Sequence, residues 1–276
     1  MTDIYLAVDT GGSQTKVVYQ VRGTAERKYL VMSPEIEQIS QVKLQEYMAR
    51  QGWIGSPAPE QQVWIEWNEQ VFVLGAFASK FDPEDRIRER KYENALYKVL
   101  AVIGLIVQKV KLSTKKKLHV QLGVLLPWNE YNDRSLFHEQ LKAMLSNFRF
   151  QGNLLKVELE RFLCRPEGGG VAVTQIRQQG IEWLRENKLG VLMFGHRNTT
   201  ALYFEHGELK HGDSPLFGFS MMLDRVIELT SGLERDSLAS AIFRGMSKAK
   251  TEIYGSYDKN SSFYEKEELV LNIPIG

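Results

Sequence analysis

The sequence is poor in cysteine, in net charge and in long apolar runs. Cys164 is the single cysteine among 276 residues, so no disulfide can form within the chain. This excludes a disulfide-stapled domain and fits a reducing compartment. Lys plus Arg number 35 and Asp plus Glu 34, so the net charge is +1. Such a balance gives no electrostatic case for direct nucleic-acid binding and leaves little repulsion against self-association.

The sequence also shows neither the pattern of a signal peptide nor that of a membrane-spanning segment. The N-terminus shows no basic segment followed by a long apolar one, so we expect no signal peptide. The most apolar run, Val99–Val107, is too short to span a bilayer and is bounded by Lys98 and Lys109. We read this run as a buried helix, and we expect a cytoplasmic protein that contacts no membrane.

What the sequence does contain is the alternation of a mixed α/β protein. Strand hairpins open both halves of the chain, at about residues 4–32 and 189–211, and helices follow each set. We therefore expect two α/β lobes that face a cleft, the first over residues 1–165 and the second over 166–276. The expected strands cover residues 4–8, 16–21, 28–32, 63–67, 71–74, 119–126, 154–162, 190–194, 199–204 and 208–210; the expected helices cover 92–110, 133–148, 171–185, 219–229 and 237–247, with mixed helical character over 34–50.

A glycine turn between the first two expected strands is suited to hold phosphate. It reads Asp9-Thr10-Gly11-Gly12-Ser13-Gln14-Thr15-Lys16. Its glycines supply the positive φ of a tight hairpin and let backbone N–H groups approach phosphate oxygens. The Ser13 hydroxyl adds a donor, Lys16 can neutralise phosphate charge, and Asp9 can hold the water shell of Mg²⁺. A plain β-hairpin with the same letters is the alternative.

Two further motifs belong to the second half of the chain. A strand–turn–strand segment places Gly195, His196, Arg197 and Asn198 at a second turn, where Arg197 and Asn198 can donate to phosphate; an ordinary hairpin is the alternative. Glu167 stands at the entrance of a helix, where it can polarise an attacking water; an acid favoured by the helix macrodipole is the alternative. The five histidines show no metal-ligand spacing.

Taken in order, these motifs resemble the bacterial actin-like ATPases, in particular the plasmid-segregation actins (ParM/StbA-like). The resemblance covers about residues 4–230. It rests on the first phosphate loop at residues 9–16, a hairpin ending in Gly-x-x-Ala at 71–78, Lys91-Tyr92 before an apolar helix, a strand ending in Pro127, the pair Pro166-Glu167, and a second phosphate loop at 191–200.

The resemblance implies two RNase H-like lobes of the actin-like ATPase fold around a nucleotide cleft. It implies ATP and Mg²⁺ as cofactors, with Asp9 as the metal-side carboxylate acting through water and Glu167 as the catalytic residue that orients the attacking water. It also implies self-association into filaments, an adaptor protein as partner, and a role in plasmid or DNA segregation or in a cytoskeleton.

The chain departs from the family pattern in two places. Met193 stands where the second loop normally carries an aspartate, and a thioether cannot orient magnesium-bound water; Arg197 replaces a small residue. The Gly-rich adenosine segment of the family is not found before Gly276, so we expect an incomplete second lobe and slow or absent hydrolysis. A non-catalytic nucleotide sensor or scaffold on the same fold is the first alternative. A small-molecule kinase of the superfamily is the second, although no residue identifies itself as its carboxylate base.

Overall fold

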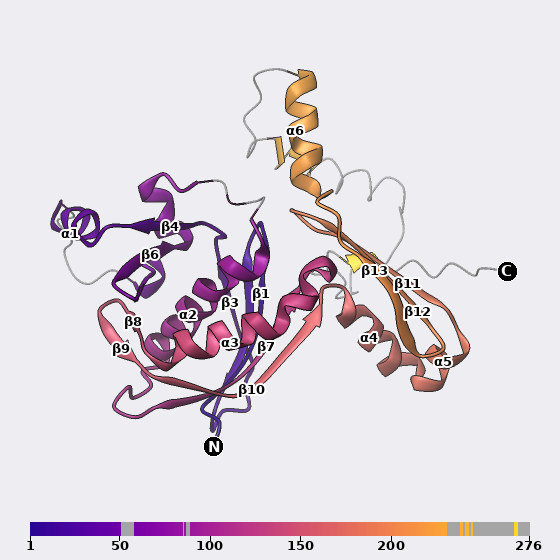
Figure 1. Cartoon of the computed structure of the whole chain (residues 1–276), viewed down its shortest axis with the longest axis horizontal. Coiled ribbons are helices and arrows are strands. Elements are labelled where there is room, and N and C mark those ends of the chain that lie inside the picture. The colour runs from indigo at the N-terminus through magenta and orange to yellow at the C-terminus, as the bar shows by residue number, and fades with distance from the viewer. Residues whose placement is uncertain are drawn as a thin grey trace. The chain divides into compact units, whose positions relative to one another are not determined.

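The structure is a computed structural model that describes residues 1–50, 58–84, 86, 89–230, 238–239, 241–242, 244 and 268–269. The chain divides into two compact units, Met1–Glu167 and Gly168–Gly276, and each unit is described by itself. Figure 1 shows their helices and strands in chain order. None of the helices among the described residues is long and apolar enough to cross a membrane.

The first unit is built on a mixed five-stranded sheet with the order β10-β7-β1-β2-β3. Its strands are β1 (Ile4–Thr10), β2 (Thr15–Val21), β3 (Lys28–Met32), β7 (Leu118–Leu126) and β10 (Val157–Pro166). β1, β7 and β10 are parallel, whereas β1, β2 and β3 form an antiparallel meander. Side chains alternate along β1, so that Ile4, Leu6 and Val8 are buried on one face.

Two helices bury the inner face of this sheet, α2 (Lys91–Lys109) and α3 (Arg134–Ser146), as Figure 1 shows. The expected helix at 133–148 is confirmed except at its ends. Leu136, next to the buried Phe137, is 44% exposed. The buried residues of α3 are Phe137, Leu141, Met144 and Leu145, which follow the 3.6-residue period that Leu136 breaks.

A second sheet of the first unit is antiparallel, with the order β4-β6-β5-β8-β9. It comprises β4 (Ile36–Ile39), β5 (Trp64–Trp67), β6 (Gln70–Leu74), β8 (Phe148–Phe150) and β9 (Asn153–Leu155), with α1 (Gln41–Arg50) and the short 3₁₀ helices η1 (Pro59–Gln61), η2 (Gly75–Phe81) and η3 (Trp128–Asp133). Helical character over the whole of 34–50 was a wrong expectation, because β4 pairs with β6 and the helix begins only at Gln41. The Ser40 hydroxyl accepts from the Lys43 N–H and so marks that start.

Two-residue turns with positive φ set the register of this second sheet. Asn68 and Glu69 join β5 to β6, and Gln151 and Gly152 join β8 to β9. The single strand expected over 154–162 is instead divided, because residues up to Leu155 pair with β8 whereas β10, from Val157, pairs with β7 in the other sheet.

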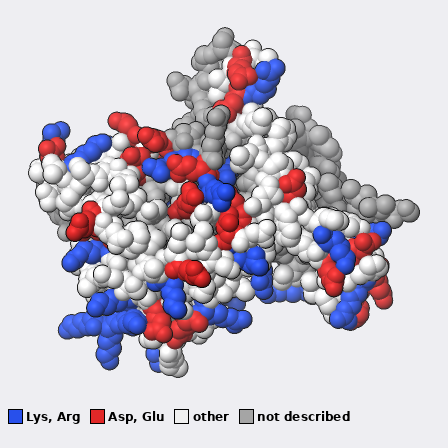
Figure 2. Space-filling model, in the orientation of Figure 1, with Lys and Arg blue, Asp and Glu red and all other residues white. Residues whose placement is uncertain are grey.

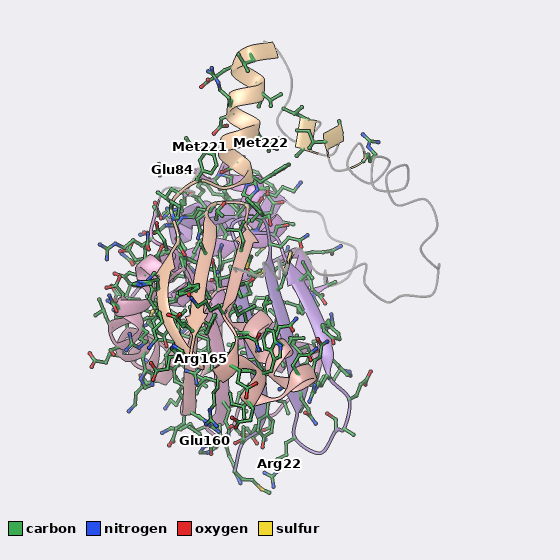
Figure 3. The ribbon with its side chains drawn as sticks, turned by 90° about the vertical axis from the view of Figure 1, so that its right-hand side faces the viewer. Arg22, Glu84, Glu160, Arg165, Met221 and Met222 are labelled. Carbon is green, nitrogen blue, oxygen red and sulfur yellow. The ribbon has the colours of Figure 1, made fainter. Side chains whose placement is uncertain are left out.

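The second unit carries an antiparallel meander, β11 (Leu189–Phe194), β12 (Thr199–Glu205) and β13 (Glu208–Asp213), and β14 (Glu268–Leu269) pairs with β11. Its helices are α4 (Gly169–Gln179), α5 (Ile181–Glu186) and α6 (Phe219–Thr230), and Met221 and Met222 lie near the start of α6 in Figure 3. The helix expected over 171–185 is broken at Gly180, whose φ is 90°. The helix expected over 237–247 falls mostly outside the described residues.

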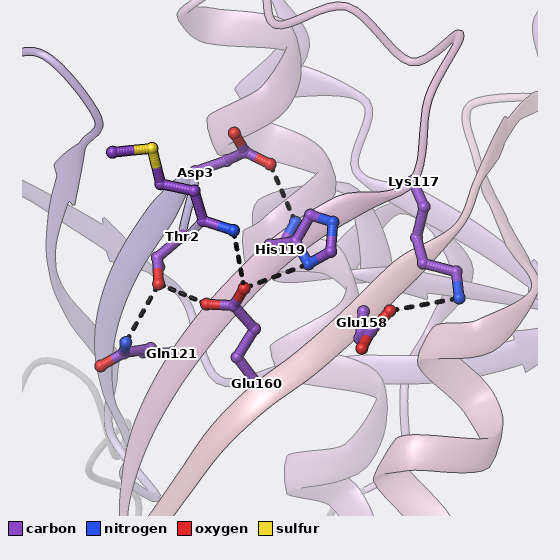
Figure 4. A network of polar contacts seen from close by, with 8 residues as sticks. Thr2, Asp3, Lys117, His119, Gln121, Glu158 and Glu160 are labelled. Carbon is purple, nitrogen blue, oxygen red and sulfur yellow. Dashed lines mark hydrogen bonds and ion pairs between the residues drawn. The ribbon is translucent and has the colours of Figure 1, made fainter.

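A polar network fixes the N-terminal edge of the parallel strands (Figure 4). The ladder between β7 and β10 is irregular at Glu160, and such a bulge re-aims a side chain. The Glu160 carboxylate accepts from the Thr2 hydroxyl and lies 3.2 Å from His119 Nδ1, while the His119 N–H donates to Asp3 at 2.9 Å. This edge is therefore occupied by groups that tie three strands together.

Candidate functional site

The opposite edge, at the carboxyl ends of the parallel strands, brings together two of the predicted site residues. Asp9 is the next-to-last residue of β1, and Glu167 directly follows β10. The Glu167 N–H donates to the Leu126 carbonyl at the end of β7, at 2.9 Å. In α/β sheets this edge is where ligands bind.

Lys91 joins the two carboxylates. Its ammonium nitrogen lies 2.7 Å from Asp9 Oδ1 and also donates to Glu167 Oε1. The side chains of Lys91 and Glu167 are only 6% and 9% exposed, whereas that of Asp9 is 37% exposed. The three residues therefore form one ion-pair cluster that is open to solvent on the Asp9 side.

Lys91 is held at an unusual place for a cation. It is the first residue of α2, where the positive end of the helix macrodipole disfavours positive charge. The buried Glu130 carboxylate accepts from the Tyr92 N–H at 3.0 Å and fixes this helix end. Burial by itself lowers the pKa of Lys91, but the charges of Glu167 and Asp9, with hydrogen bonds to both, raise that pKa above its ordinary value.

A second buried lysine lies seven residues further along the same helix. Lys98 is 6% exposed. Burial and the nearby charge of Lys91 lower the pKa of Lys98 to about 8, and Glu35 and Asp9 oppose that shift. One carboxylate oxygen of Glu35, Oε2, is itself buried and has no hydrogen-bond partner among the described residues. Lys98 is thus electrostatically linked to the cluster around Lys91.

The first glycine turn adjoins Asp9, but its glycines work differently from the prediction. Neither Gly11 nor Gly12 has a positive φ. Glycine is needed at position 11 because a Cβ there would lie 2.8 Å from the Gln14 carbonyl oxygen. Gly12, Ser13 and Gln14 are exposed to solvent. Lys16 lies directly across the ladder from Asp9, so both side chains emerge on the same face of the sheet.

The second turn has the same construction within its own unit. A Cβ at Gly195 would lie 2.7 Å from the Asn198 carbonyl oxygen, to which the Gly195 N–H donates at 3.0 Å. The carbonyl oxygens of Gly195 and His196 accept from the first N–H groups of α6, those of Phe219 and Ser220, at 3.0 and 2.9 Å. These two donors of the helix are therefore engaged by the turn.

The polar residues that end the second turn are bound internally. The Asn198 amide donates to the Thr200 hydroxyl at 3.3 Å, and that hydroxyl lies 2.9 Å from the Ser214 hydroxyl. The Thr199 hydroxyl donates to the Phe217 carbonyl at 2.5 Å. Whether Gly195, His196, Arg197 and Asn198 contact phosphate stays a prediction.

The water-mediated magnesium role that the sequence predicts for Asp9 stays a prediction. The geometry disfavours only an ion coordinated directly by both Asp9 and Glu167, because the Lys91 ammonium already lies between their oxygens. No group of three His, Cys, Asp or Glu side chains able to hold a metal occurs in the described part of the chain. Positive and negative side chains are also interspersed over the described surface in view in Figure 2.

The sequence singled out Asp9 and Glu167 but missed Lys91 and Lys98 as members of the site. The spacing of the two lysines could have indicated that they share a side of the helix. Lys91 begins α2 and Lys98 follows seven residues later, which is two helical turns. The sequence took Lys98 as the solvent boundary of a buried run, and burial of its whole side chain corrects that interpretation.

Comparisons with known proteins find similarity in structure alone. No protein-family model matches the sequence, and no curated protein matches it either. The AlfA filament from a B. subtilis plasmid (pLS32) is similar with a TM-score of 0.54 and 12% identity, over 84% of this chain and 80% of that one. The apo ParM protein of psk41 is similar with a TM-score of 0.53 and 15% identity, over 91% of this chain and 81% of that one. An archaeal actin homologue, Ta0583, is similar with a TM-score of 0.52 and 16% identity, over 84% of this chain and 69% of that one.

A further structure of the AlfA filament contains AMPPNP. It is similar to this chain with a TM-score of 0.50 and 14% identity, over 85% of this chain and 78% of that one. These likenesses establish the fold of the chain.

Proposed function

We propose that this chain, which has the fold of the actin-like ATPases, binds ATP beside the first glycine turn. The observation that carries the proposal is the cluster of Asp9, Lys91 and Glu167 at the carboxyl ends of three parallel strands. Buried ion pairs seldom stabilise a fold better than apolar residues would, which favours a functional reason for the cluster. The exposed Lys16, next to the turn, supplies a cation for phosphate.

Self-association belongs to the same proposal. AlfA forms a filament, and one of its filament structures contains AMPPNP. The near-zero net charge of this chain opposes assembly little. We infer a nucleotide-dependent filament with a cytoskeletal or plasmid-segregation role, for which an adaptor protein would be the second partner.

Hydrolysis is proposed to be slow. Glu167 is the residue placed to orient an attacking water, but its Oε1 accepts from Lys91, so only its remaining oxygen is left for that task. Met193 supplies no carboxylate from the second turn. Loss of one electrostatic contact of this kind typically costs several kcal/mol of barrier.

Titration calorimetry with ATP, followed by sedimentation with ATP and AMPPNP, tests the proposal. Gly11→Ala should abolish binding, because its Cβ would collide with the Gln14 carbonyl and distort the turn. Gly123→Ala in β7 is the matched control, since its Cβ would meet nothing closer than 3.9 Å. Binding that is absent from the wild type, or equal in both variants, would exclude this site.

A nucleotide-binding scaffold without turnover is the second candidate, and Met193 is the observation that favours it. It would bind and assemble as above yet release no phosphate. A steady-state phosphate-release assay separates the two, and repeating it with added sugars tests for a kinase.

A further inference from the structure

The space between Asp9 and Glu167 is filled by a cation that belongs to the chain itself. The Lys91 nitrogen lies 2.7 Å from Asp9 Oδ1 and is hydrogen-bonded to Glu167 Oε1, and the lysine is almost fully buried. A magnesium ion shared by these oxygens would sit about 2.0–2.1 Å from each. It would then lie within a few ångströms of the ammonium, where like charges in a poorly hydrated site repel strongly.

Lysines also offset most of the negative charge around the cluster, which weakens its attraction for a dication. Three carboxylates, those of Asp9, Glu35 and Glu167, are matched by three lysines, Lys16, Lys91 and Lys98. Lys16 lies across the ladder from Asp9, and Lys98 interacts with Glu35, Asp9 and Lys91. The buried Glu130, whose carboxylate accepts from the N–H of Tyr92 next to Lys91, is a fourth acid near the cluster, so the three lysines offset most of the negative charge before any ligand is bound.

We infer that Lys91 neutralises this carboxylate pair in place of a magnesium ion, so that the chain binds ATP almost as tightly without magnesium as with it. The inference rests on the proposed function for its nucleotide, and it concerns which cation neutralises the carboxylates of that same site. Removal of the lysine side chain should expose the two carboxylates to each other and turn the pair into a site for a dication.

The first test compares the affinity of the wild-type chain for ATP in excess Mg²⁺ and in EDTA, by titration calorimetry. A loss of less than about tenfold in EDTA supports the inference, and a larger loss overturns it; tenfold corresponds to ~1.4 kcal/mol. If ATP binds under neither condition, the proposed function fails and the second test still decides the inference.

The second test needs no nucleotide and uses Mn²⁺ as the probe, followed by electron paramagnetic resonance. Any Mn²⁺ that the wild-type chain binds should remain bound after the substitution Glu167→Gln. Lys91→Gln should gain one Mn²⁺, and adding Glu167→Gln to it should abolish that gain. Stoichiometric Mn²⁺ on the wild type that Glu167→Gln removes would overturn the inference. So would a folded Lys91→Gln chain, verified by circular dichroism, that binds none.

Discussion

Met193 holds in β11 the position that Asp9 holds in β1. Asp9 pairs across the ladder with Lys16, and Met193 pairs with Thr200, seven residues ahead in each case. Each precedes by two residues a glycine whose Cβ would collide with a carbonyl oxygen three residues further on, at 2.8 Å in the first turn and 2.7 Å in the second. The two turns are built alike, but one has a carboxylate where the other has a thioether.

Restoring that carboxylate should raise turnover. In Met193→Asp we expect the rate of phosphate release to rise by about tenfold or more, because the resemblance to the actin-like ATPases leads us to expect an aspartate at this position of the second phosphate loop. Met193→Asn is the matched control, since it has the shape of aspartate without its charge and should leave the rate low. Brisk hydrolysis by the wild type that Glu167→Ala does not change would contradict this account of the site.

Lys16 should contribute to nucleotide affinity. Lys16→Ala removes the exposed cation opposite Asp9 and should weaken ATP binding by about tenfold, or ~1.4 kcal/mol. Lys28→Ala, which removes an exposed lysine on β3 of the same sheet, should leave the affinity unchanged. Calorimetry in low salt measures both. Equal effects of the two substitutions would mean that only the overall charge matters.

Lys98 should make stability depend on pH in the alkaline range. Its pKa is lowered to about 8 in the folded chain from 10.5, so the folded state binds fewer protons than the unfolded state between these values. The cost of burying its charge is present below pH 8 and is relieved as the pH rises from 8 towards 10.5, by up to about 1.4 kcal/mol per pH unit.

Cys164 acts in the opposite sense above pH 9, because burial raises its pKa to about 11. The effect of Lys98 is therefore read as a difference between the wild type and Lys98→Met in urea denaturation at pH 7.5 to 10. The variant should be more stable at the lower pH, and its advantage should shrink as the pH rises. Lys28→Met controls for the loss of one positive charge. A constant difference for Lys98→Met would contradict the prediction.

Gly104 should be required in the middle of α2. A Cβ at this position would lie 2.2 Å from the Phe150 ring, so an added methyl group forces the ring or the helix to move. Gly104→Ala should destabilise the chain by roughly 1–3 kcal/mol, although alanine is otherwise favoured in a helix by ~1 kcal/mol. Phe150→Leu should recover part of the loss. Gly170→Ala in α4 meets nothing within 4 Å and should not destabilise.

Much of the fold was readable from the sequence because it depends on neighbouring residues. The meanders β1-β2-β3 and β11-β12-β13, the hairpin β5-β6 and the helices α2 and α6 lie where apolar periodicity and turn residues predicted them. The strand β4 was not foreseen, since its four residues are stabilised by pairing with β6, more than thirty residues further along the chain. Patterns of neighbouring residues cannot predict pairing with a strand that lies so far along the chain.

For the candidate site, the sequence by itself indicated the two turns and singled out Asp9 and Glu167, and the resemblance to the actin-like ATPases added that Met193 stands where an aspartate is expected. Only the tertiary structure decided that Lys91 lies between those acids, because it is 82 residues from Asp9 and 76 from Glu167 along the chain. The parallel pairing of β1, β7 and β10 brings the two acids to one edge, and the packing of α2 buries the lysine against them. A charge's partner is set by distance in space and by the water excluded around it, and neither is written in the spacing of residues.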